Sequence, residues 1–259
     1  MTSRIPVLCG LAGYQAAVAE LPLRTRQARD AAEAIVVVQG VGNWSDRVRK
    51  AAGAGARAVI VSCPAVVPAA EVHRLRADLG RLPVILERAL FRSDASSDVA
   101  AGRAVIGSSD VRLVAVDGAA LPTEMGTVLQ DAIAWARVLA GGALAWHAAS
   151  VGLALSNGTG SGDVPVALNV VQIAAGGSWI RAHALAEVRS ELEATTERTV
   201  VITTGEHGAV VAPARFETPQ RLTLRRAIHA LERGDEPLDL AELAADAELA
   251  EQLTGVESL

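Results

Sequence analysis

The sequence is poor in cysteine and in aromatic residues. It contains two cysteines, Cys9 and Cys63, and only 3% of its residues are Phe, Trp or Tyr. Two cysteines provide neither a disulfide framework nor the spacing of a metal-ligand set. Each of them ends an apolar segment, so we expect two buried, reduced thiols. The five histidines show no HxxxH or HxH spacing, and we therefore predict no metal site.

Long apolar runs and blocks of like charge are also missing. No stretch approaches the roughly 18 consecutive apolar residues of a membrane-spanning helix. The apolar run at 5–11 is too short for the hydrophobic region of a signal peptide. The formal net charge is −5, and no cluster of charges favours nucleic acid or an anionic membrane as a partner. We therefore expect a cytoplasmic protein that binds neither.

Hydrophobic residues, which make up 51% of the 259 residues, are what the sequence has in abundance. In the first half, short apolar segments alternate with helical ones. We predict strands at 5–9, 34–39, 58–62 and 83–87, with helices near 13–20, 44–54 and 68–80. The strands are rich in Val and Ile and show little alternation, which indicates burial on both faces of a doubly wound parallel sheet.

From about residue 93 the pattern changes. Ser, Asp and Gly residues between 93 and 110 predict a loop or weak structure. We then predict a strand at 111–117, a helix from 123 or 124 to 140, strand-like segments at 144–155, 164–174 and 182–193, a hairpin at 199–204 and 209–212, and helices at 219–233 and 239–253. Apolar and charged residues alternate over 184–191, with one slip of phase, which indicates an antiparallel sheet with one open face. The glycine-rich segment 156–162 is expected to be a long hairpin turn.

The fold class that follows is α/β plus α+β. We expect a trimmed Rossmann-like parallel sheet, followed by an antiparallel-sheet domain with helices on one face. The domains are placed at 1–92 and 93–259, with the option that the C-terminal helix packs back on the first domain.

Four segments resemble those of a known family. AVIVSCPAVVPAAEVHRL (58–75) has the family's strand that ends in a small-x-Pro turn, and PVILERAL (83–90) resembles the strand that ends in its Glu-Lys-Pro signature. LQDAIAWARVLAGG (129–142) resembles a helix that bears an Asp and, four residues on, a His. FETPQRLTLRRAIHALERGDEP (216–237) resembles the C-terminal helix. In this order and spacing they resemble the Gfo/Idh/MocA family, the glucose–fructose oxidoreductase and inositol dehydrogenase group.

The resemblance implies the ancestry of an NAD(P)-dependent dehydrogenase that acts on a sugar-like molecule. It implies a dinucleotide, NAD or NADP, near one edge of the parallel sheet, and catalytic groups close by. The implied cofactor-binding residues are Gly10, Gly13, Cys63, Pro64 and Glu87. The implied catalytic residues are Arg88 and Asp131.

The sequence departs from the family pattern at the reacting groups. Arg88 stands where the family has the signature lysine, and Ala89 stands where it has the proline. An arginine stays protonated and so cannot serve as a general base, although it can orient a substrate oxygen. Trp135 stands where the family has the histidine. Asp131 is retained, and it equally suits a structural carboxylate on a helix face.

The glycine fingerprint is also incomplete. The turn after the first strand reads Leu8-Cys9-Gly10-Leu11-Ala12-Gly13, so Leu8 takes the place of the first glycine of G-x-G-x-x-G. No acidic residue ends the segment 34–39, which the sequence suggests as the next strand. Gly40 and Gly42 offer an alternative phosphate-cradling turn. The cofactor thus stays open between NAD, NADP and none.

Three hypotheses about function follow. The leading one is a diverged Gfo/Idh/MocA-like protein without autonomous dehydrogenase activity. It would be a partner or regulatory subunit that forms a homo- or hetero-oligomer through the open sheet face. The second is an active NAD(P)-dependent oxidoreductase of a sugar, polyol or keto-sugar. The third is a non-catalytic module that binds a small molecule.

Overall fold

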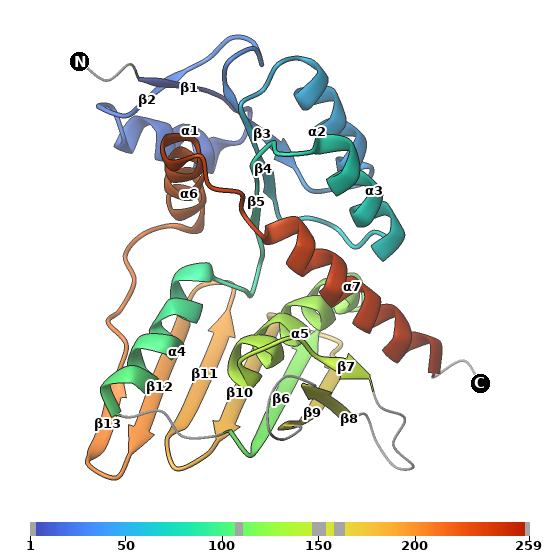
Figure 1. Ribbon diagram of the computed structural model, residues 1–259, viewed down its shortest axis with the longest axis vertical. Coiled ribbons are helices and arrows are strands. Elements are labelled where there is room, and N and C mark those ends of the chain that lie inside the picture. Colours follow the sequence, from blue (N-terminus) through green and yellow to red (C-terminus); the bar gives the residue numbers. More distant parts are fainter. Residues whose placement is uncertain (1–3, 107–110, 147–153, 158–163, 257–259) are drawn as a thin grey trace. The chain divides into compact units, whose positions relative to one another are not determined.

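The computed structural model describes residues 4–106, 111–146, 154–157 and 164–256 (Figure 1). Its internal contacts divide the chain into two compact units. The first consists of Met1–Arg88 and Phe216–Ala245, and the second of Ala89–Arg215 and Asp246–Leu259. The division into domains at 1–92 and 93–259, expected from the sequence, stays a prediction.

The first unit contains a five-stranded parallel sheet with the strand order β2-β1-β3-β4-β5. Its strands are β1 (Ile5–Leu8), β2 (Thr25–Gln27), β3 (Ile35–Gln39), β4 (Ala58–Ser62) and β5 (Val84–Glu87). Its helices are α1 (Ala12–Glu20), α2 (Trp44–Gly53), α3 (Ala69–Leu79), α6 (Pro219–Arg233) and the first part of α7 (Asp239–Val256). The predicted Rossmann-like parallel sheet is confirmed.

Both faces of this sheet are covered, which explains the unbroken apolar strands. Val36 and Val38 of β3 lie in one hydrophobic core with Trp44 of α2. Ile35 of the same strand lies in a second core with Ile228 of α6. Because side chains alternate along a strand, a strand between two cores must be apolar at successive positions.

The strand β2 does not appear in the sequence-based prediction. It consists of Thr25, Arg26 and Gln27, of which only Thr25 is buried. So short an edge strand with two exposed polar residues has no apolar pattern. In the sheet, β2 lies on one side of β1 and β3 on the other.

The second unit contains an eight-stranded mixed sheet with the order β13-β12-β11-β10-β6-β9-β8-β7. Its strands are β6 (Leu113–Ala120), β7 (Ala145–Trp146), β8 (Ala154–Asn157), β9 (Val164–Gln172), β10 (Trp179–Leu185), β11 (Arg189–Thr195), β12 (Thr199–Gly205) and β13 (Gly208–Val211). The pair β6–β9 is parallel, and the other pairs are antiparallel. Helices α4 (Ser93–Ile106) and α5 (Met125–Ala140) lie on one face of the sheet (Figure 1).

The strand β10 shows how the two faces differ. Ile180, Ala182 and Ala184 are buried in the core beneath the helices. The intervening Arg181 is exposed, and His183 is only partly buried. This alternation confirms the expected sheet with helices on one face.

Two predictions for this unit are wrong. The segment 93–110 was expected to be weak structure, whereas Ser93–Ile106 forms α4, because Ala95 and Val99, one turn apart, are buried in the core. The expected single strand at 182–193 is two antiparallel strands, β10 and β11. The slip of phase in the sequence marks the turn between them. Most of the expected hairpin turn at 156–162, and residues 147–153 of the expected strand 144–155, lie outside the described residues.

Candidate functional site

The carboxyl ends of the parallel strands gather most of the residues implied by the resemblance. In a parallel sheet these ends meet at one edge, which is where ligands of doubly wound folds bind. Gly10 follows β1, Cys63 and Pro64 follow β4, and Glu87 and Arg88 end β5. Asp131 belongs to α5 in the second unit.

Gly10 is a glycine that the protein's own packing does not require. A Cβ added to Gly10 would meet no atom within 4 Å, and its backbone is not left-handed. The helix α1 starts two residues later without a side-chain cap. Open space beside uncapped backbone N–H groups is the arrangement that a dinucleotide pyrophosphate needs. This turn therefore fits the cofactor, although Leu8 remains a strand residue.

Gly13 serves the packing of two helices. A Cβ added to Gly13 would lie 3.2 Å from Cγ of Gln220, which belongs to α6. The position fits the third glycine of the fingerprint, which allows close packing of the first helix. In this protein the close neighbour is another helix.

Gly40 is required by the turn next to it. A Cβ added to Gly40 would overlap the carbonyl oxygen of Cys63 and Cα of Pro64. Backbone hydrogen bonds from Gly40 N to Ser62 O (2.7 Å) and from Ala65 N to Gly40 O (2.7 Å) hold the two loops together. The glycine is thus explained by loop packing, which weakens the alternative of a second phosphate turn.

The two thiols differ in exposure. Cys9 is buried, and burial raises the pKa of its thiol, although the nearby Gln27 amide lowers it. Cys63 is exposed, contrary to the expectation of two buried thiols. The backbone of Cys63 is left-handed, with φ of 50°. The apolar pattern of the preceding strand does not predict this conformation.

Glu87 is the centre of a buried polar cluster. Only 5% of the surface of this residue is exposed. Oε2 accepts hydrogen bonds from the Tyr14 hydroxyl (2.8 Å) and the Ser62 hydroxyl (2.6 Å). Oε1 accepts from Nε2 of Gln220. The carboxylate therefore joins α1, β4 and α6 at the carboxyl edge of the sheet, and the same burial makes it poorly accessible to a substrate.

Tyr14 is strongly affected by this environment. Burial raises the pKa of its hydroxyl far above the usual value near 10, and the neighbouring Glu87 raises it further. The phenol therefore stays protonated and donates to the carboxylate.

Arg88 is also buried, with 8% of its surface exposed. An arginine guanidinium effectively always carries its charge in proteins. Arg88 lies next to Glu87 in the sequence, at the end of β5. Its identity and burial do not support a role as a general base.

In the second unit, Asp131 binds backbone. The residue is 1% exposed, and its Oδ2 accepts a hydrogen bond from Leu90 N at 2.8 Å. One helical turn on, Nε1 of Trp135 donates to the carbonyl oxygen of the same Leu90, also at 2.8 Å. The Trp135 ring packs against Phe91 with 4.8 Å between ring centroids. The two residues at the positions of the family's aspartate and histidine thus fix the segment that follows β5.

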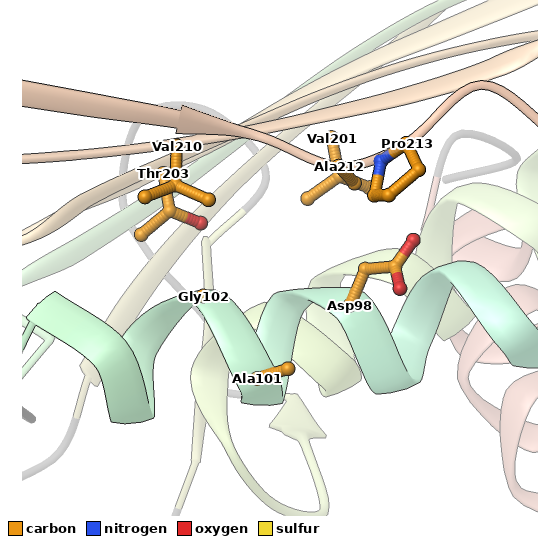
Figure 2. Close-up of a pocket in the computed structure, with 8 residues that line it drawn as sticks. All are labelled: Asp98, Ala101, Gly102, Val201, Thr203, Val210, Ala212 and Pro213. Atoms are coloured by element: carbon orange, nitrogen blue, oxygen red, sulfur yellow. The ribbon is translucent and has the colours of Figure 1, made fainter.

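A cavity of about 120 Å³ lies within the second unit, between α4 and the strands β12 and β13 (Figure 2). Asp98, Ala101 and Gly102 of α4 face it from the helix. The other lining residues are Val201, Thr203, Val210, Ala212 and Pro213. Sites for drug-sized ligands occupy about 300–1,000 Å³, so this cavity is too small for a nucleotide sugar.

Among the residues that the structure describes, no group of three or more His, Cys, Asp and Glu side chains could hold a metal ion. No helix in the same part of the chain has the length and apolar character needed to cross a membrane.

A doubly wound parallel-sheet unit, followed by a unit built on a broad mixed sheet, is a fold shared with solved structures of known proteins. A 3-ketoreductase from Actinomadura kijaniata, in complex with TDP-benzene and NADP, superposes with a TM-score of 0.65 at 15% identity, over 97% of this chain and 96% of that one. The chain thus has the fold of the Gfo/Idh/MocA-type oxidoreductases, which confirms the resemblance at the level of the fold.

Two further structures agree. UDP-N-acetylglucosamine 3-dehydrogenase from Acidithiobacillus ferrooxidans gives a TM-score of 0.65 at 12% identity, over 96% of this chain and 95% of that one. A dehydrogenase from Clostridium difficile gives 0.62 at 8% identity, over 99% and 100%. No protein-family model and no curated protein sequence matches.

Three side chains at the candidate site were missed by the sequence reasoning. They are Tyr14, Ser62 and Gln220, the donors to Glu87. Tyr14 directly follows Gly13, and a tyrosine at the start of a helix could have signalled a buried polar contact. Gln220 lies 133 residues from Glu87 in the chain, and no local pattern connects the two.

Proposed function

We propose that this chain is a diverged protein of the Gfo/Idh/MocA-like oxidoreductase fold that binds a dinucleotide and lacks autonomous dehydrogenase activity. It would act as a partner or regulatory subunit. A bound dinucleotide supplies hydride transfer, and a dehydrogenase must add a group that exchanges a proton with the substrate. The chain's own residues supply binding at the Gly10 turn but no suitable proton-exchanging group at the implied positions.

The observation that carries this proposal is the pair of hydrogen bonds to Leu90. A general base must reach the proton that it abstracts, whereas Asp131 is buried and bound to Leu90 N. Trp135, bound to Leu90 O, has no exchangeable proton of suitable pKa. Arg88 cannot become neutral. All three implied proton-transfer positions are thus unsuited to the reaction.

The cofactor that we propose is NADP. The strand order puts the end of β2 beside that of β1, where Gln27 Nε2 donates to Cys9 O at 3.2 Å. An acid at this point would bind the ribose hydroxyls of NAD, whereas an arginine accommodates the 2′-phosphate of NADP. Here the end of β2 carries Gln27 and, two residues on, the exposed Arg29.

Substitution of Arg29 tests this choice. In Arg29→Glu we expect the dissociation constant for NADP to rise about 10- to 100-fold, and that for NAD to change little, because a charge-assisted contact to phosphate is lost. Arg26→Glu is the matched control, since Arg26 is an exposed arginine within β2, whereas Arg29 follows the end of the strand. Equal affinities for NADP and NAD in the unmodified chain would contradict the assignment.

The open face of the eight-stranded sheet is the proposed surface for assembly, as a homo- or hetero-oligomer. It presents Trp179, with the Arg181 guanidinium 5.2 Å from the ring centroid, and the exposed Leu185. Arg181 also pairs with Glu193 of β11. An aromatic residue, an arginine and apolar neighbours are typical of interface centres.

Two measurements test the function. Isothermal titration with NADP should show binding, while absorbance at 340 nm should show no turnover with sugars, nucleotide sugars and their keto forms. Turnover above the enzyme-free rate would instead establish the second candidate, an active oxidoreductase of a sugar-like substrate, which the fold match over 97% of the chain favours. Light scattering that shows a monomer, with no co-purifying chain, would contradict the role in assembly.

A further inference from the structure

Two of the three donors to Glu87, Tyr14 and Gln220, lie next to Gly13 at the end of the glycine turn. Tyr14, which donates to Glu87 Oε2, directly follows Gly13 in α1. Gln220, which donates to Glu87 Oε1, also lies against Gly13, whose added Cβ would be 3.2 Å from Gln220 Cγ. The first turn of α1 is thus held from two sides by one carboxylate.

The same residue is anchored to the sheet through its backbone. Glu87 is the last residue of β5, and its carbonyl oxygen accepts from Cys63 N at 2.8 Å. Its carboxylate also binds the hydroxyl of Ser62, the last residue of β4. Movements of α1 relative to the central strands are therefore opposed by hydrogen bonds that all end on Glu87.

We propose that Glu87 is a positioning residue for the dinucleotide. It fixes the first turn of α1, whose backbone N–H groups would face the pyrophosphate, without touching the cofactor. This inference rests on the proposed function for its ligand. Backbone N–H groups bind an anion well only when their directions are fixed in advance, and the carboxylate supplies that order by accepting hydrogen bonds from both sides of the turn.

The choice of residue at position 87 fits this role. A buried carboxylate that loses its donors is costly, so the three donors must stay in place whenever the chain is folded. An apolar residue of similar size would fill the space but would leave the orientation of Tyr14 and Gln220 undetermined. Buried polar groups of this kind select one arrangement among several that pack equally well.

The experiment compares the unmodified chain with Glu87→Met, Tyr14→Phe and Gln220→Met. Glu87→Met removes all three acceptor contacts, whereas the other two variants each remove one donor. Glu236→Gln is the control, because it removes an exposed carboxylate of the same unit. Two quantities are measured: hydrogen exchange of the amides of residues 10–16 in the chain without nucleotide, and the dissociation constant for NADP.

In Glu87→Met we expect exchange at residues 10–16 to accelerate about tenfold relative to residues 44–53, and the dissociation constant for NADP to rise about tenfold. Tyr14→Phe and Gln220→Met should show smaller changes in the same direction, and Glu236→Gln none. Unchanged exchange at 10–16, or an acceleration equal to that at 44–53, would overturn the inference.

Two complications have their own readouts. If Glu87→Met does not fold, Tyr14→Phe and Gln220→Met decide, and unchanged exchange at 10–16 in both would overturn the inference. If the unmodified chain binds neither NADP nor NAD, the proposed cofactor is wrong. An accelerated exchange at 10–16 would then support the fixing of the turn by Glu87, and its assignment to a dinucleotide would fall with the cofactor.

Discussion

The hydroxyl of Tyr14 donates a hydrogen bond of 2.8 Å to Oε2 of Glu87, and Tyr14 is the only tyrosine of the chain. A single spectroscopic signal therefore reports on this buried contact. Burial, followed by the nearby carboxylate, raises the pKa of Tyr14 in the folded protein. In the unfolded chain the pKa returns to about 10.

From this we predict how stability depends on alkaline pH. Above about pH 10 the unfolded chain loses the phenolic proton while the folded protein keeps it, so the free energy of unfolding falls as the pH rises. Below about pH 10 the contribution of Tyr14 is fully present. Absorbance at 295 nm should show no phenolate in the folded protein at pH 11 and a transition near pH 10 in denaturant. A folded-state transition near pH 10 would contradict the burial of the hydroxyl.

A second prediction concerns the two hydrogen bonds to Leu90. In Trp135→Phe the ring packing is largely kept but the donor to Leu90 O is lost, so the free energy of unfolding should fall by about 1–3 kcal/mol. Asp131→Ala should cost a similar amount, because the buried Leu90 N loses its acceptor. Asp131→Asn keeps an acceptor oxygen and should cost less. Denaturant titrations measure these differences, and a neutral Asp131→Ala would argue that the carboxylate serves another purpose.

A third prediction concerns Gly40 and Gly10, which should differ in how strongly a change to alanine affects stability, because their surroundings differ. Gly40→Ala should lower the free energy of unfolding by about 1–3 kcal/mol or more, since the new Cβ would overlap Cys63 and Pro64 backbone. Gly10→Ala meets no atom within 4 Å and should leave thermal stability nearly unchanged. It should nevertheless weaken NADP binding, because the methyl group occupies the space proposed for the pyrophosphate. Equal loss of stability in both variants would refute the distinction.

The fourth prediction tests the close approach of α4 to the sheet (Figure 2). A Cβ added to Gly102 would overlap Oγ1 of Thr203 and lie 2.9 Å from its Cβ. Gly102→Ala should therefore destabilise the protein by about 1–3 kcal/mol. In Gly102→Ala/Thr203→Ala part of this loss should be recovered, because one of the two contacts is removed. Strict additivity of the two single changes would show that helix and strand move apart freely.

The sequence was informative wherever a segment is buried on both sides. Strands β3 and β4 were predicted almost to the residue, because Ile35 to Val38 and Ala58 to Val61 supply both cores. The end of α5 was equally clear, since Gly141 is left-handed with φ of 81°. Local pattern and tertiary structure agree in such segments.

Several of the failures share a cause, which is that the deciding contact lies far away in the chain. The helix α4 is rich in Ser and Asp, yet Arg215, more than a hundred residues on, pairs with Asp94 and Asp98. Asp131 and Trp135 lie four residues apart on α5, but their common partner, Leu90, could not be inferred from a helix pattern. At the candidate site, the residues of the sheet edge were predicted and the donors that hold Glu87 were not.

Because α6 supplies Gln220 to the carboxylate and Leu224, Ala227 and Ile228 to the core beside β1, β3, β4 and β5, the first unit draws on two distant parts of the polypeptide. On the ribosome, the five parallel strands emerge long before this helix is translated. The part of this apolar face that α6 covers is then exposed while more than a hundred further residues are added. We expect chaperones that recognise exposed aliphatic surface to bind during that interval. A product truncated ahead of α6 would keep this apolar surface exposed and would be prone to aggregate.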